Sequence, residues 1–192
     1  MKWTKADRQY LLDMRKDIDV DNLKLKEQIK QLLLHDKYIV HVLNNKELEK
    51  QDAEPDDYFG VNILPFYAIP DIQHNIQNYV CYETGFKDIP QWDKSQKYEQ
   101  ITFYILCHKD NIIDKDTSLA RHDLLAGLIK RLVNNEPFLG GRFKCVSDLP
   151  SVIDNDYPAR TLIFEQLTDS DLVKKVGGKM MYGNKTGVIS NG

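Results

Sequence analysis

The stretch ITFYILCHKDNIIDKDTSLARHDLLAGLIKRL, residues 101–132, decides the fold. Alternate residues of its first part are apolar and share one face, as in a β-strand: Ile101, Phe103, Ile105 and Cys107. Its last part has helical spacing, with one apolar stripe along it: Leu125, Leu128, Ile129 and Leu132. A polar turn separates the two patterns. We therefore expect a strand over 98–108, a helix over 118–135, and an α+β protein.

The predicted strand over 98–108 is apolar on both faces, because its second face carries Tyr104. Strands of this kind are usually central in a sheet, covered by helices or by a neighbouring subunit. Residues 114–118 offer several caps for the helix that follows, and Lys130 and Arg131 favour its carboxyl end.

The same two patterns of apolar residues, strand-like alternation and helical spacing, predict the elements on the amino-terminal side. Thr4, with Asp7 three residues later, opens a short first helix. A stronger helix follows at about 22–35, where Asp21 is the expected cap and one face is apolar: Leu25, Ile29, Leu32 and Leu33. Residues 37–43 are rich in β-branched and aromatic side chains, so we expect a strand there.

Prolines and short apolar runs indicate further strands. Pro65 and Pro70 limit the apolar segment 58–70 to an edge strand or an extended segment, because proline lacks the amide hydrogen that a strand ladder needs. Three other segments have the composition of strands: 78–83, 142–146 and 159–167.

The chain of 192 residues is 42% apolar, which is enough for one domain with a sizeable core. We expect an amino-terminal extension over 1–21 with the short helix in it, and a single α+β domain over 22–175. Residues 176–192 are rich in glycine and have no periodicity, so we expect a flexible tail.

Charge and hydropathy argue against several classes of function. The formal net charge of -3 arises from 26 basic and 29 acidic residues mixed along the chain, so no basic patch is available to phosphates. We expect no direct sequence-specific nucleic-acid binding. No apolar run approaches the roughly 20 residues that span a bilayer, so we expect no membrane insertion. The cysteines are spaced as reduced core residues: Cys81, Cys107 and Cys145.

Residues with catalytic or metal-binding chemistry do not form a recognisable set. His122 and Asp123, next to Arg121, are adjacent on a predicted helix and therefore about 100° apart, so we expect them not to face each other. Cys107 and His108 point to opposite sides of a strand, so they do not form a zinc site with His122. The sequence predicts no catalytic residue, no cofactor and no metal site.

The order of these elements resembles the small tail-terminator and head–tail joining proteins of long-tailed bacteriophages. The residues that carry the resemblance are the strand–turn–helix unit over 101–132, with its RHDLL helix start, and the closing strand RTLIFEQL at 160–167. The resemblance spans 22–167. It implies a mixed, mainly antiparallel sheet with helices packed on one face. The extra proline-rich section, 55–90, departs from the pattern and leaves another collar or head-closure protein as an alternative.

The resemblance also implies a function. A homo-oligomeric ring, typically hexameric, would terminate the tail tube and join it to the head connector, as a structural virion protein of the neck assembled in the host cytoplasm. Its interface would lie over 58–82 and 109–118, where Tyr is favoured for protein contacts. The candidate interface residues are Tyr58, Phe59, Phe66, Tyr67, Asp110, Asp114, Arg121 and His122.

Two alternatives of other classes stay open. One is a small intracellular enzyme that uses His108, His122 and a loop carboxylate. The other is an adaptor that binds a host protein through the aromatic edge strand.

Overall fold

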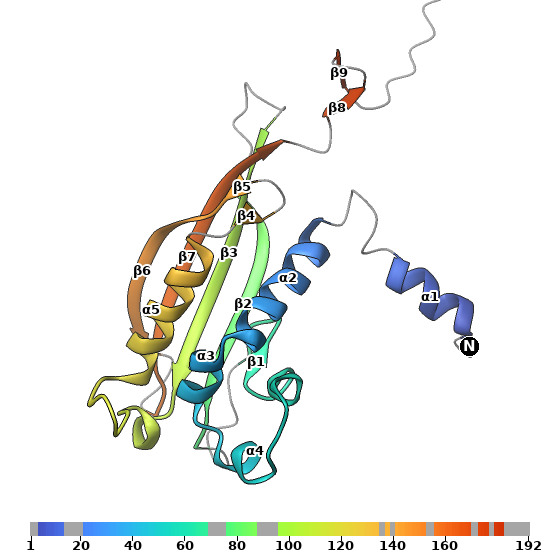
Figure 1. Ribbon diagram of the computed structural model, residues 1–192. Helices are drawn as coiled ribbons and strands as arrows, with labels where there is room; N and C mark the ends of the chain where they lie inside the picture. Colours follow the sequence, from blue (N-terminus) through green and yellow to red (C-terminus); the bar gives the residue numbers. More distant parts are fainter. Residues whose placement is uncertain are drawn as a thin grey trace, which may run out of the picture.

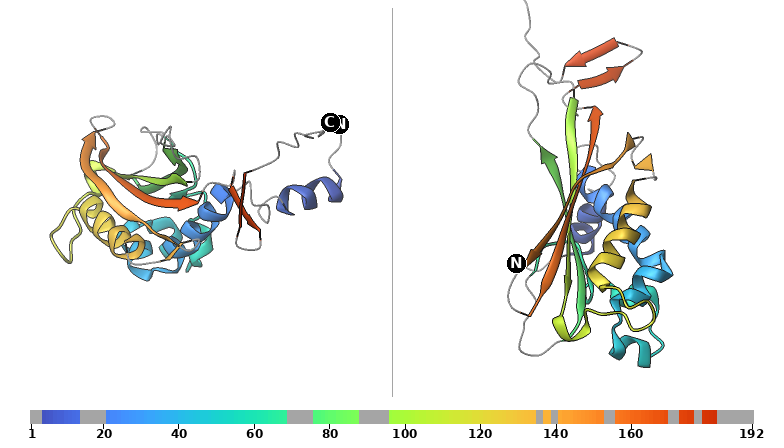
Figure 2. Two further views of the ribbon diagram at one scale, coloured as in Figure 1. Left: turned by 90° about the horizontal axis from the view of Figure 1, so that it is seen from above. Right: turned by 90° about the vertical axis from the view of Figure 1, so that its left-hand side faces the viewer.

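The computed structural model describes residues 4–13, 21–68, 76–87, 96–134, 137–138, 141–152, 156–169, 173–176 and 179–182. Its main feature is a five-stranded sheet with the spatial order β1 (Ile63–Leu64), β2 (Asn78–Lys87), β3 (Gln96–Cys107), β7 (Pro158–Asp169) and β6 (Lys144–Val152). One face is covered by helices (Figures 1 and 2): α2 (Asp21–His35), α3 (Lys37–Leu43) and α5 (Arg121–Val133). The predicted α+β class, with helices packed on one face, is confirmed.

Strand β3 is the central strand that the sequence predicted, and it is antiparallel to both β2 and β7. Its residues that face the helices are fully buried: Ile101, Phe103, Ile105 and Cys107. Phe103 meets Phe164 edge to face at a centroid distance of 5.6 Å and lies 6.2 Å from Tyr82. These contacts place the main core between β3 and the helices.

The short strand β1 lies at the edge of the sheet and is parallel to β2. Pro65 follows it directly, so the ladder stops after two residues. The prediction of an edge strand or an extended segment here is confirmed.

The sheet face opposite the helices, which we call the open face, carries Thr102, Tyr104, Leu149, Thr161 and Ile163. One end of it is closed by a small cluster: Leu64, Tyr79, Cys81, Leu106, Tyr157 and Ala159. Tyr67 adds to this cover by packing on Tyr104 at 4.6 Å. Leu149 is 61% exposed. Helices α2, α3 and α5 lie on the other face of the sheet (Figure 2).

The prediction of a strand over 37–43 was wrong, because these residues form α3. Asp36 caps the helix, since its Oδ1 accepts hydrogen bonds from the amides of Tyr38 (2.8 Å) and Ile39 (3.2 Å). Asn44 ends the helix in the left-handed conformation, with a φ of 52°. Caps and the burial of Ile39, Val42 and Leu43 at helical spacing outweigh the strand propensity of the β-branched residues.

Helix α2 covers the predicted range and buries Leu25, Ile29 and Leu33 as predicted. Leu34 completes the buried face, whereas Leu32 is half-buried, and Asp21, the expected cap, is the first residue of the helix. Helix α1 (Lys5–Asp13) begins with the predicted reciprocal cap, in which the Thr4 amide donates to Asp7 and the Asp7 amide donates to Thr4 Oγ1. No residue of α1 is buried.

Helix α5 begins later than predicted and without a side-chain cap, because its N-cap is Ala120. Asp114, one of the predicted caps at 114–118, does not cap the helix, because its carboxylate accepts hydrogen bonds from the amide and hydroxyl of Thr117. The connection to α5 also holds η4 (Lys109–Asn111), while α4 (Lys46–Lys50) and η3 (Pro55–Tyr58) lie between α3 and β1.

The carboxyl-terminal part differs from its prediction where it is described. Two short ribbons are present, β4 (Pro137–Phe138) with β5 (Gly141–Arg142), and β8 (Val173–Val176) with β9 (Lys179–Tyr182). Strand β9 lies within the segment predicted to be a flexible tail. Residues 177–178 and 183–192 of the predicted tail lie outside the described residues. None of the described helices is long and apolar enough to cross a membrane.

The cap of α3 gives a stability test. Replacing Asp36 with Ala removes the cap and the ion pair that Asp36 makes with Arg131, at 2.9 Å. We expect a loss of about 1 kcal/mol from the cap alone. Arg131→Ala removes this ion pair together with the contact of the guanidinium with the Tyr38 ring, at 5.8 Å, and leaves the cap in place, so it is the control, with an expected cost of about 0.5 kcal/mol or less from the ion pair. Urea unfolding of both variants measures the difference, and equal losses would contradict the assignment of Asp36 as the cap.

Candidate functional site

A polar cleft of about 720 Å³ lies at the end of the sheet where β3 stops. Its walls come from segments that are far apart in the sequence: the ends of α3 and α4 over 41–47, residues 76–77, the loop over 110–116, and Arg121 at the start of α5. Concave sites with convergent polar groups are where ligands usually bind. The cleft is therefore the first candidate site among the described residues.

A buried ion pair forms one wall of the cleft. The guanidinium of Arg121 lies 3.0 Å from Asp114 Oδ1, and the two residues are only 6% and 4% exposed. Arg121 Nη1 also donates to the carbonyl of Val42 in the last turn of α3, at 3.2 Å. The pair therefore fastens the loop, α3 and α5 to one another, and its burial favours a structural role over the interface role predicted for both residues.

The carboxylate of Asp114 is held on its other side by Thr117. Its Oδ2 accepts hydrogen bonds from the Thr117 hydroxyl at 2.8 Å and from the Thr117 amide at 3.0 Å. These two bonds lower the pKa of Asp114, and the charges of Arg121 and His41 lower it further. Asp114 is therefore an anion at neutral pH.

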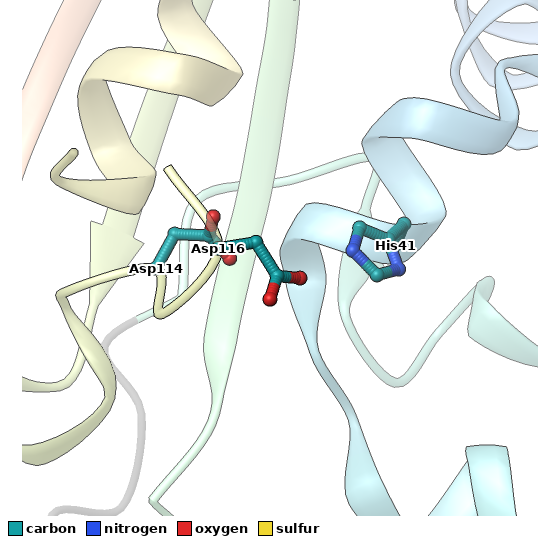
Figure 3. A group of neighbouring side chains, drawn as sticks. All are labelled: His41, Asp114 and Asp116. Carbon is teal, nitrogen blue, oxygen red and sulfur yellow. The ribbon is translucent and has the colours of Figure 1, made fainter. Parts of the chain in front are cut away.

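His41, Asp114 and Asp116 converge in this cleft (Figure 3). One side-chain ligand atom from each lies within 4.8 Å of those of the other two. His41 comes from the last turn of α3, and both aspartates come from the loop before α5. Sequence reasoning missed this group because residues 37–43 were expected to form a strand. The available signal was the spacing of Asp114 and Asp116 in a single turn.

Three asparagines connect α4 and α3 to the sheet beside the cleft. Asn45 donates to the Asn62 side chain at 2.7 Å, Asn62 donates to the carbonyl of Asn78 at 2.8 Å, and Asn78 donates to the carbonyl of Leu43 at 3.0 Å. All three are buried. These buried hydrogen bonds fix the position of α4 and α3 against the sheet, so this wall of the cleft is preformed. Nothing in the local sequence pattern indicated this network.

Cys107 and His108, which were considered as catalytic or metal-binding residues, do not line the cleft. His108 is buried, packs edge to face on Tyr157 at 5.2 Å, and accepts a hydrogen bond from the Asp110 amide at 3.2 Å. Burial raises the pKa of the Cys107 thiol, so it is protonated and a poor metal ligand or nucleophile at neutral pH. Within the described residues, Cys107 and His108 do not belong to the group of potential metal ligands that forms.

His122 and Asp123 lie nearer to each other than expected. His122 Nε2 is 3.6 Å from Asp123 Oδ1, so the expectation that they do not face each other was too strict. The same oxygen accepts a hydrogen bond from Arg160 Nη1 at 2.5 Å. Arg160 also binds Asp148, which pairs with Lys130 of α5. Asp123 is thus part of a charged network that joins α5 to β6 and β7.

The aromatic interface candidates divide into two groups. Tyr58 is 3% exposed and belongs to the main core, and Phe59 is half-buried beneath Lys30, at 4.5 Å. Phe66 and Tyr67 are exposed, and both lie just after β1. Asp110 is also exposed and His122 is half-buried. Of the aromatic candidates, Phe66 and Tyr67 present the most surface to a partner.

The hydrogen bonds to Asp114 predict a dependence on pH. Its pKa in the fold lies below that of the unfolded chain, so this carboxylate stabilises the fold at neutral pH and loses that effect as the pH falls through its folded-state pKa. Thr117→Val removes the hydroxyl donor, and we expect the pKa of Asp114 to rise. NMR titration of the Asp114 carboxyl carbon measures this shift. Thr117→Ser keeps the donor and should leave the pKa near that of the original protein; an unchanged pKa in the valine variant would refute the assignment.

Comparison with known proteins places this architecture in a family. The YomW family model matches residues 36–166, about two thirds of the chain, from the residue that caps α3 into the last part of β7. The matched region includes β1, β2, β3, β6, most of β7 and every residue of the cleft. A search of curated proteins found no match. The chain belongs to the YomW family, which is a phage-associated family.

Proposed function

We propose that this chain is a structural virion protein of the phage neck, which forms a ring that terminates the tail tube and joins it to the head connector. The observation that carries the proposal is the YomW match over α3 to β7. Within that region, helices precede an antiparallel strand pair, a polar loop leads to α5, and a second strand pair closes the sheet. Tail-terminator and head–tail joining proteins are expected to have this order of elements.

The open face of the sheet supports self-assembly. On this face Leu149 is exposed, and Thr102 and Ile163 are half-buried. Apolar side chains left uncovered on one face of a sheet are typical of protein contact surfaces. In a closed ring, each subunit would bury this face against its neighbour.

The edge strand β6 favours contact through side chains over contact through strand pairing. Its ladder with β7 is interrupted by a bulge between Cys145 and Ser147, and Pro150 lies within the strand. Bulges and prolines protect sheet edges from pairing with another chain. We therefore propose the open face, together with Phe66 and Tyr67, as the main contact surface.

The proposed partners are other copies of this chain, in a hexameric ring, the tail tube protein and the head connector. The proposed location is the virion, after assembly in the host cytoplasm. We propose no enzymatic activity, since the side chains of His108 and Cys107 are buried. Another collar or head-closure protein of the same fold would share these features, because fold alone does not determine function.

Ring formation is the first test of this proposal. We expect the purified protein to form a single large species as its concentration rises, because the open face becomes buried between subunits. Light scattering gives the mass, and negative-stain microscopy shows the shape. Addition of isolated tail tubes should place the ring at one end of each tube. A protein that stays monomeric at high concentration, both alone and with tail tubes, would contradict the proposal.

A charged substitution on the open face should prevent assembly. Leu149→Asp places a carboxylate where a neighbour would pack, and we expect the mass to fall to that of a monomer while the circular dichroism spectrum stays the same. Leu23→Asp is the matched control, because Leu23 is also exposed but lies on α2. Its mass should match that of the unaltered protein. Assembly by the Leu149 variant would exclude the open face as the contact surface.

A further inference from the structure

We propose that His41, Asp114 and Asp116 bind one divalent transition-metal ion, of which Zn²⁺ fits best. The three side chains point toward a common region of the polar cleft (Figure 3). Their ligand atoms lie within 4.8 Å of one another, which is close enough for small side-chain movements to place all three around one ion. The set provides one imidazole nitrogen and two carboxylate oxygens, with the cleft open to a water molecule as a fourth ligand.

The ligand types decide the class of ion. Imidazole nitrogen suits Zn²⁺ and its neighbours in the first transition row, whereas Mg²⁺ and Ca²⁺ prefer sites made of oxygen alone. The two carboxylates carry two negative charges, of which the ion pair with Arg121 offsets one, so the site is attractive to a cation. Lys115 and Arg121 also line the cleft, but Arg121 is already paired with Asp114.

This group differs from an ordinary cluster of surface acids in two respects. His41 comes from α3, so the ligands converge from separate elements of the fold. Asp114 is buried and held from behind, as metal-binding carboxylates usually are. Its Oδ2 accepts two hydrogen bonds from Thr117, while its Oδ1 forms the ion pair with Arg121 and has a further lone pair for an ion.

The bound ion would join the loop before α5 to the last turn of α3. Arg121 and Asp114 already connect these segments in the interior. The ion would add a second connection at the surface through His41 and Asp116, both of which are exposed. Metal binding should therefore stabilise the fold, and the effect does not depend on whether the chain forms a ring.

Titration of the full-length protein with Zn²⁺ and Co²⁺ tests the site directly. We expect one ion per chain by calorimetry, a visible absorption band from bound Co²⁺, and a thermal unfolding midpoint that rises with Zn²⁺ concentration. His41→Ala and Asp116→Asn should each weaken binding by about tenfold or more. Both residues are exposed, so both variants should fold, which circular dichroism checks.

The control variants are His35→Ala and Asp56→Asn, which remove an exposed histidine and an exposed acid outside the cleft. They should bind Zn²⁺ like the original protein. Absence of binding, or equal binding by the double variant of His41 and Asp116, would overturn the proposal. Neither result bears on ring formation, because mass measurements in the presence of a chelator test that separately.

Discussion

The two ladders of β3 hold the sheet together, because β3 pairs along its length with β2 on one side and with β7 on the other. The register of these ladders places Phe103 opposite Tyr82 and Leu162, under the helices. A shift of one residue would turn this apolar set to the open face and expose it. The positions of α2, α3 and α5 therefore follow from the pairing of one strand.

The covered face and the open face of the sheet differ in how far their side chains are buried. Helices pack on the first and supply most of the buried apolar surface, which stabilises the chain on its own. The second has a small cluster at one end and exposed residues such as Leu149 elsewhere. The polar cleft lies at the end of the sheet, where the loop before α5 meets α3. The proposed contact surface and the proposed ion site therefore lie in different parts of the fold and can be tested independently.

Sequence reasoning succeeded where structure is local. Residues 101–132 contain two clear periods, so their strand and helix were predictable. It failed for 37–43, where the caps at Asp36 and Asn44 and the packing of α3 outweigh residue preference. The candidate site was largely out of reach. His41 meets the loop at 114–116 only through the tertiary fold, and no local pattern shows that Asp114 is buried in an ion pair with Arg121.

One carboxylate, that of Asp36, binds two helices at once. Its Oδ1 caps α3 and its Oδ2 pairs with Arg131 near the end of α5. Three of the described strands lie between these two helices in the sequence, yet disturbance of this residue affects both helices. Local opening of α3 should therefore be cooperative with fraying of the last turn of α5, so the amides of these two segments would exchange with solvent as a single unit.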